Sequence, residues 1–130
     1  MKKFTVHIED RTDSEPRPHE KKIAYLIAEI FKSDVVFLRR AQSKSPDLYI
    51  IRTGVRWEIK SPMGGSKHTI QNNLRAADSQ SENVILDLTR SKLTDKQGVS
   101  RAKEFIKAER SRIKRIKVLT RGGQIIDIKK

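Results

Sequence analysis

Two short runs of alternating apolar and polar residues, separated by Thr53-Gly54, constrain this chain more than any other stretch. Residues 47–52 and 55–60 have the length and the alternation of β-strands. A connection of two residues that ends in glycine is typical of a tight β-hairpin. The sequence therefore predicts an antiparallel strand pair closed by a two-residue turn.

The register of this hairpin determines which side chains share a face. With Arg52 opposite Val55, the side chains of Asp47, Glu58 and Lys60 lie on one face. The other face should point into a core through Leu48, Ile50, Val55, Trp57 and Ile59. Opposed Cβ atoms lie about 5 Å apart and diagonal ones about 7–8 Å, so both carboxylates could reach one cation beside the ammonium. Mg²⁺ is often held by one or two carboxylates with water and substrate phosphate, so this face predicts a catalytic metal site.

The same stretch resembles the signature of a known enzyme superfamily. Pro46-Asp47, ten intervening residues and then Glu58-Ile59-Lys60 resemble the PD-(D/E)xK nuclease motif. Over about residues 18–120, the chain resembles one branch of it, the C-terminal nuclease domains of contact-dependent growth-inhibition toxins, often directed at tRNA. The segments that carry this likeness are helix 18–32, Ser61-Pro62 after the motif, the helix that contains Thr69-Ile70 and Leu74-Arg75, and strand 83–88.

The resemblance implies a metal-dependent endonuclease directed at tRNA or other RNA. Asp47 and Glu58 would hold Mg²⁺, for which Mn²⁺ or Zn²⁺ could substitute. Lys60 would orient the attacking water or stabilise charge in the transition state. Glu20, in the first turn of a helix, would complete the ligand set, and its structural alternative is an acid that complements the helix dipole.

Hydrophobic periodicity outside the hairpin predicts the remaining elements. The order of helices and strands predicts an α/β fold with helices covering a mixed sheet, which agrees with the αβββαβ core of the nuclease superfamily plus a C-terminal helix and hairpin. We expect one domain over residues 1–130, with an edge strand and a linker within residues 1–17. The predicted elements are helix 18–32, strand 35–38, helix 67–81, strand 84–88, a helix from Thr94-Asp95 whose inward positions run to Ile113, and a closing hairpin of 116–120 and 124–128.

The charge predicts a polyanionic partner. The net charge is +13 and the pI is about 10.3. From Thr89 onward there are 14 Lys and Arg against 4 Asp and Glu. Lysines and arginines that neutralise phosphates release counterions, which favours RNA or DNA. The predicted phosphate contacts are a ridge on the third helix, formed by Lys103, Lys107, Arg110 and Lys114, together with Ser66, Lys67, Arg75 and Gln80.

Composition excludes several other classes. The chain has no cysteine, which removes disulfides and thiolate metal sites. No apolar run approaches the length of about 18 residues that a membrane span requires, so we expect no membrane insertion and a cytoplasmic site of action. Aromatic residues make up 5% of the chain, too few for a base-stacking platform.

Four alternatives remain open at this stage. The first is a DNA endonuclease of the same fold, and the second is a nucleic-acid-binding module without turnover. The third is a metal-independent ribonuclease that uses His7, His19 or His68. The fourth is an interaction protein whose basic face serves an acidic partner, a role that is compatible with a nuclease toxin bound by an acidic immunity protein.

Overall fold

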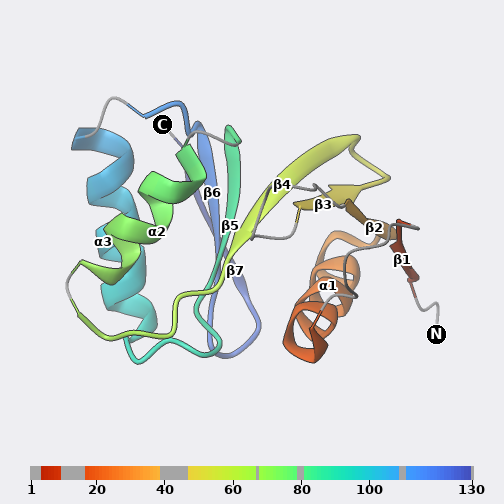
Figure 1. Ribbon diagram of the computed structural model, residues 1–130, viewed down its shortest axis with the longest axis horizontal. Helices are drawn as coiled ribbons and strands as arrows, with labels where there is room; N and C mark the ends of the chain where they lie inside the picture. Colours follow the sequence, from red (N-terminus) through yellow and green to blue (C-terminus); the bar gives the residue numbers. More distant parts are fainter. Residues whose placement is uncertain are drawn as a thin grey trace. The chain divides into compact units, whose positions relative to one another are not determined.

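The computed structural model confirms the predicted α/β class and describes residues 4–9, 17–38, 47–66, 68–78, 81–108 and 111–129, with the side chains of Asp47 and Ala108 left out. The described residues form three helices and seven strands (Figure 1). In chain order these are β1 (Val6–Ile8), α1 (Pro18–Phe31), β2 (Val35–Leu38), β3 (Asp47–Ile50), β4 (Val55–Lys60), α2 (Thr69–Asp78), β5 (Asn83–Asp87), α3 (Asp95–Ala108), β6 (Arg115–Leu119) and β7 (Ile125–Lys129).

The chain divides into two compact units, Met1–Trp57 and Glu58–Lys130. In the first unit, β1 pairs with β2 in parallel and β2 pairs with β3 in antiparallel orientation. Helix α1 provides the apolar cover, because its three- and four-residue spacing buries one face, formed by Ile23, Ala24, Ile27 and Ala28. The strands bury Val35, Phe37, Leu48 and Ile50.

The ends of α1 follow from its sequence. Pro18 begins the helix, where a missing backbone N–H costs nothing. The helix ends at Phe31 and is capped by Lys32, whose φ of 50° is left-handed, and the N–H of Ser33 donates to the carbonyl oxygen of Ala28 at 3.1 Å. This end leads directly into β2.

The turn between β3 and β4 differs from the predicted two-residue turn. It spans the four residues 51–54, with the N–H of Gly54 donating to the carbonyl oxygen of Ile50 at 2.8 Å. The chain reverses early because Ile51 donates to the carbonyl oxygen of Asp34 at 3.2 Å and Arg52 donates to Oγ of Ser33 at 2.9 Å. These bonds hold both residues against the connection between α1 and β2. The turn is longer by an even number of residues, so it does not reverse the predicted alternation.

In the second unit, β4, β5 and β6 run parallel and β7 returns antiparallel to β6. Helices α2 and α3 lie side by side on one face of these strands (Figure 1). Their apolar faces meet alternate residues of the strands in one core. Its members are Ile70, Leu74, Ala77, Val84, Leu86, Leu88, Leu93, Ala102, Phe105, Ile106, Ile113, Ile116, Val118 and Ile128.

Helix α3 ends earlier than predicted. We expected its inward positions to continue to Ile113, but the helix stops at Ala108. The connection that follows is tied to the end of α2, because the carboxylate of Asp78 accepts hydrogen bonds from Oγ of Ser111 at 2.5 Å and from the N–H of Arg112 at 2.6 Å. Lys114 therefore lies beyond the helix rather than on its basic ridge.

Candidate active site

Glu58 and Lys60 form a shielded acid-base pair on β4. The side chain of Glu58 is 0% exposed and that of Lys60 is 11% exposed. Nζ of Lys60 lies 3.6 Å from Oε2 of Glu58, a separation that suits an ion pair and is longer than a hydrogen bond. A Glu-x-Lys triplet on a solvent-facing strand would expose both side chains, so Glu58 and Lys60 are not an ordinary surface pair.

The strand register shows which face this pair occupies. Glu58 is in register with Val84 and Lys60 with Leu86 on the parallel strand β5. Val84 and Leu86 belong to the core beneath α2 and α3. Residues in register on neighbouring strands point to the same face, so the pair lies on the face that these helices cover.

Burying this charged pair costs free energy of folding. Removing a carboxylate from water destabilises its charged form unless a partner compensates, and the ammonium of Lys60 supplies part of that compensation. An apolar pair of similar size would often stabilise the fold equally well or better. A buried charged pair of this kind makes Glu58 and Lys60 candidates for a chemical role.

Asp47, the other predicted carboxylate, is described only through its backbone. It is the first residue of β3 and stands in register with Leu38. Its neighbours Leu48 and Ile50 are buried, as predicted for the core-facing positions of the hairpin. Trp57 is also buried and packs on Phe31, with ring centroids 6.4 Å apart. Among the side chains that the structure describes, no group of three His, Cys, Asp or Glu residues could hold a metal ion.

Glu20 has a structural contact at the start of α1. Its Oε1 accepts a hydrogen bond from the N–H of Arg17 at 2.7 Å, which satisfies a backbone donor at the helix terminus. This contact is a helix cap, and it agrees with the structural alternative of an acid in the first turn that the sequence left open. Its assignment as a metal ligand stays a prediction.

The loop after β4 packs closely on the start of α2 and on the loop after β5. A Cβ on Gly64 would come within 2.9 Å of Oγ1 of Thr69, and one on Gly65 within 3.0 Å of Cβ of Lys92. At the start of α2, Oγ of Ser66 accepts from the N–H of His68 at 3.3 Å. Ser66 thus holds the turn into α2, because its carbonyl oxygen also accepts from the N–H of Thr69 at 3.1 Å.

The other predicted phosphate contacts lie in different parts of the second unit. Arg75 is exposed on α2, and Lys103 and Lys107 are exposed on α3. Lys114 forms a surface ion pair with Glu82 at 3.6 Å. Three further predicted contacts, namely Lys67, Gln80 and Arg110, lie outside the described residues.

One buried acid escaped the sequence analysis. Asp87 is 0% exposed at the end of β5, where its Oδ1 accepts from the N–H of Thr89 at 2.9 Å and from Oγ1 of Thr89 at 2.6 Å. A charge inside the apolar strand 84–88 was the available signal. Because Asp87 follows Leu86, strand alternation directs it away from the face of Glu58 and Lys60, so we assign it to the turn.

The three histidines lie in three separate parts of the chain. His7 is on β1, where its Nε2 is 3.6 Å from Oδ2 of Asp34 and its side chain is half exposed. His19 is in the first turn of α1, and His68 immediately precedes α2. No feature of their settings indicates a catalytic histidine.

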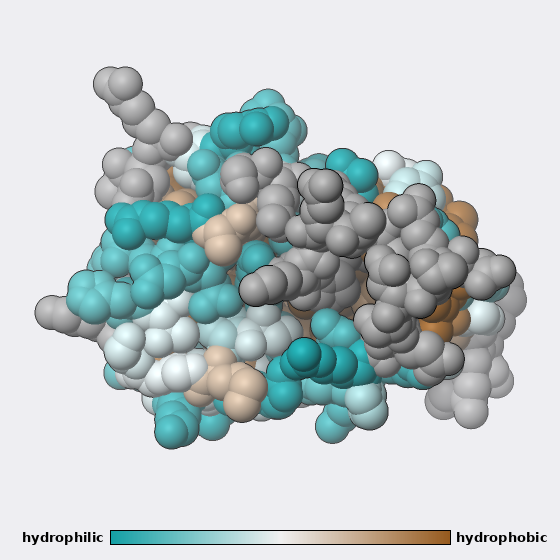
Figure 2. Space-filling view, in the orientation of Figure 1, coloured by the Kyte–Doolittle hydropathy of each residue, from teal (hydrophilic) through white to brown (hydrophobic). Residues whose placement is uncertain are grey.

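Hydrophilic residues dominate the described surface of the second unit in the view of Figure 2. None of the helices formed by the described residues combines the length and the apolar character that a membrane span needs.

Comparisons with known proteins identify relatives of this chain. The family model described as the contact-dependent growth inhibition CdiA C-terminal domain matches residues 44–125. The chain also resembles a solved structure, the CdiA-CT/CdiI toxin and immunity complex from Burkholderia pseudomallei, with a TM-score of 0.68 and 17% identity over 95% of this chain and 99% of that one. At this identity the likeness shows the fold alone. No curated protein matches.

Proposed function

Because the chain belongs to the contact-dependent growth inhibition CdiA C-terminal domain family, we propose that it is a toxin domain and that its toxic activity is metal-dependent nuclease cleavage. The observation that carries the nuclease proposal is the shielded ion pair of Glu58 and Lys60. The two residues occupy the Glu and Lys positions of the motif that the sequence resembles. Their burial on β4 supports a chemical role, because a charged pair there is costly for folding.

Asp47 and Glu58 are the proposed metal ligands. Glu58 supplies hard carboxylate oxygens in a partly dehydrated setting, a donor type that fits Mg²⁺ and also accepts Mn²⁺ or Zn²⁺. The support for Asp47 is its place at the start of β3, immediately before the buried Leu48. Such an ion, when bound, lowers the pKa of its water and polarises the scissile phosphate. Glu20 is a weaker ligand candidate because the N-terminus of α1 already uses its carboxylate.

Lys60 is the proposed electrostatic group of the site. Its ammonium lies beside Glu58 and its side chain is 11% exposed, so the charge is largely screened from bulk water. It would interact with any phosphate that approaches the carboxylate. In such a setting a fixed positive charge stabilises the extra negative charge of the transition state more than it would in water. Lys60 would also orient the attacking water.

The proposed substrate is RNA, with tRNA favoured by the resemblance of the sequence. The net charge of +13 supports a nucleic-acid substrate, and most of the excess lies after Thr89. Ser66 and Arg75, with Lys67 and Gln80, are the proposed phosphate contacts of the second unit. A DNA substrate would draw on the same charge, so the assay below includes duplex DNA.

The proposed protein partner is an immunity protein. The solved structure from Burkholderia pseudomallei is described as a toxin and immunity complex. The excess positive charge of this chain suits an acidic partner. We propose the cytoplasm of a recipient cell as the place where the toxin acts.

The deciding experiment measures cleavage by the unaltered domain and by Glu58→Gln. Total tRNA, messenger RNA and duplex DNA are incubated with Mg²⁺ or with chelator, and the products are resolved by electrophoresis. Glu29→Gln is the matched control, because it makes the same chemical change at an exposed position on α1. We expect the unaltered domain to cleave tRNA and chelator to abolish this cleavage. Glu29→Gln should keep the cleavage rate, and Glu58→Gln should lower it by at least about a hundredfold.

Other results would reassign the function. Cleavage that continues in chelator and leaves cyclic phosphate ends would indicate a metal-independent ribonuclease. Salt-dependent binding without cleavage, unaffected by Glu58→Gln, would indicate a binding module.

A further inference from the structure

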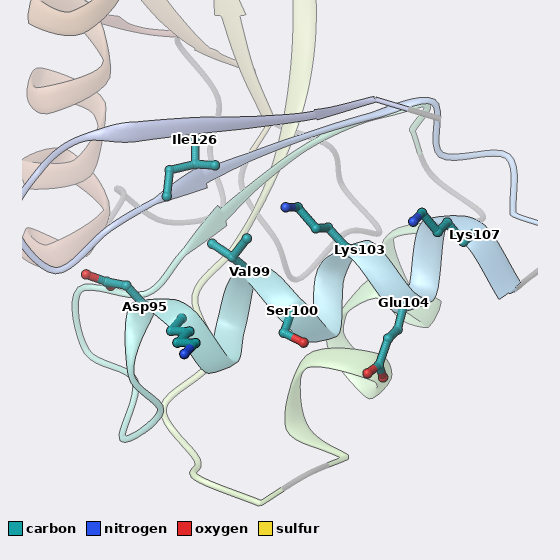
Figure 3. A pocket seen from close by; sticks show the side chains of 8 residues that line it. Asp95, Val99, Ser100, Lys103, Glu104, Lys107 and Ile126 are labelled. Atoms are coloured by element: carbon teal, nitrogen blue, oxygen red, sulfur yellow. The ribbon is translucent and has the colours of Figure 1, made fainter.

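A groove runs between α3 and β7 in the second unit, away from the strand that carries Glu58 and Lys60. It has a volume of about 450 Å³ and is lined by Asp95, Lys96, Val99, Ser100, Lys103, Glu104, Lys107 and Ile126 (Figure 3). The groove exists because α3 covers Ile128, which is buried, but leaves Ile126 37% exposed on the same face of β7. The outer end of the strand is therefore only partly covered.

The floor of the groove is apolar. Val99 points from α3 toward Ile126 on β7 (Figure 3). Val99 is half-buried against the core, and Ile126 is one of the exposed large hydrophobic residues of the chain. An exposed apolar floor with charged walls is the usual composition of a protein-binding surface.

The charge along the groove is predominantly positive. Lys96, Lys103 and Lys107 are exposed, and no side-chain hydrogen bond or ion pair joins them to another residue in the part of the chain that the structure describes. The two acids are already engaged. Oδ1 of Asp95 accepts from the N–H of Arg121 at 3.0 Å, and Glu104 is 3.6 Å from Arg101 and points to the opposite side of α3 from Ile126 (Figure 3).

From this combination we propose that the groove between α3 and β7 is a docking site for an acidic segment of a partner protein, with an apolar side chain seated on Val99 and Ile126. A nucleic-acid backbone would use the lysines but has no apolar group to cover this floor, and the groove offers no aromatic ring for a base to stack on. Lys103 and Lys107, predicted as phosphate contacts, would instead pair with carboxylates. The inference rests on the proposed function only for the identity of the partner as an immunity protein.

The test measures binding by fluorescence anisotropy. The probe is a short fluorescein-labelled peptide in which glutamates flank a central leucine. Comparison probes replace the leucine by serine, replace the glutamates by lysines, or use a labelled single-stranded RNA. The variants are Lys103→Glu and Ile126→Ser, with Lys22→Glu and Ile8→Ser as matched controls at exposed positions of the first unit.

We expect the glutamate-leucine peptide to bind best and each groove variant to weaken it by about tenfold. The control variants should keep its affinity within about twofold. The inference is overturned if this peptide does not bind, if control and groove variants weaken it equally, or if the groove variants weaken RNA binding while leaving peptide binding unchanged. The assay uses no nuclease activity, so its outcome is distinguishable from a failure of the proposed role of Glu58.

Discussion

Nζ of Lys60 lies 3.6 Å from Oε2 of Glu58, two residues away on the same strand and on the same face of β4. The two charges are unequally shielded, because Glu58 is 0% exposed while Lys60 is 11% exposed. The charged form of the buried Glu58 therefore needs the neighbouring ammonium more than the charged form of Lys60 needs the carboxylate, because Lys60 is partly hydrated. The stability of the two single variants should show the difference.

Lys60→Met should therefore destabilise the domain more than Glu58→Gln. The methionine leaves a buried carboxylate without its ammonium, which costs about 3 kcal/mol or more. Glutamine keeps the shape of Glu58 and removes its charge, and the long side chain of Lys60 can move its ammonium toward water, so we expect a loss of about 1–2 kcal/mol.

Urea unfolding of both variants and of the double variant measures this difference. The double variant should resemble Glu58→Gln, because the buried charge is gone in both cases. If Lys60→Met and Glu58→Gln lose equal free energy of unfolding, the buried carboxylate does not depend on the ammonium of Lys60 in this way.

Divalent metal should stabilise the domain through the same carboxylate. A ligand that binds only the folded state at a hundred times its dissociation constant adds about 2.7 kcal/mol. Mg²⁺ and Mn²⁺ should raise the melting temperature of the unaltered domain and of Glu29→Gln, and should have little effect on Glu58→Gln. This measurement is independent of turnover. An identical metal-induced shift in Glu58→Gln would remove Glu58 from the proposed ligand set.

The hairpin formed by β3 and β4 shows which features of the fold the sequence could predict. Alternation correctly predicted that Leu48, Ile50 and Trp57 are buried, because burial on a strand repeats with a local period of two. The predicted length of the turn was wrong because hydrogen bonds to Ser33 and Asp34 end β3 early. No local sequence pattern relates these two residues to Ile51 and Arg52.

Non-local bonds also explain the other differences. The early end of α3 depends on the bond between Asp78 and Ser111, which lie on segments far apart in the sequence. The pattern placed Glu58 on the face opposite the apolar residues, but it did not predict that this face would be buried as well, with Glu58 in register with the core residue Val84. The groove beside Ile126 arises because α3 covers β7 incompletely, and strand periodicity carries no information about such coverage.

The clamp between Asp78 and Ser111 makes stability depend on acid pH. The hydrogen bond from the hydroxyl of Ser111 holds the pKa of the Asp78 carboxyl below its ordinary value of 3.8, and the N–H of Arg112 adds to this effect. A carboxyl whose pKa is lower in the folded state contributes stability above its unfolded value. That contribution is lost as the pH falls through the lower, folded value.

Asp78→Asn should accordingly destabilise the domain by about 1 kcal/mol at pH 7, because two hydrogen bonds to a carboxylate are weakened. The difference from the unaltered domain should shrink as the pH falls below 3.8. Thermal unfolding from pH 7 to pH 3 measures it. A difference that stays constant over this range would show that the charge of Asp78 is not involved.

Gly98 lies where α3 packs tightly against Leu88, the residue that follows β5. A Cβ at this position would lie 2.4 Å from Cδ1 of Leu88, which is itself fully buried. Alanine is favoured over glycine inside a helix by about 1 kcal/mol, but overpacking a core costs about 1–3 kcal/mol, so Gly98→Ala should be destabilising by about 1 kcal/mol. Gly122→Ala is the matched control, because nothing lies within 4 Å of its added methyl group. In urea unfolding, combining Gly98→Ala with Leu88→Ala should cost less than the sum of the two single changes, and a strictly additive result would place the origin of the loss outside this contact.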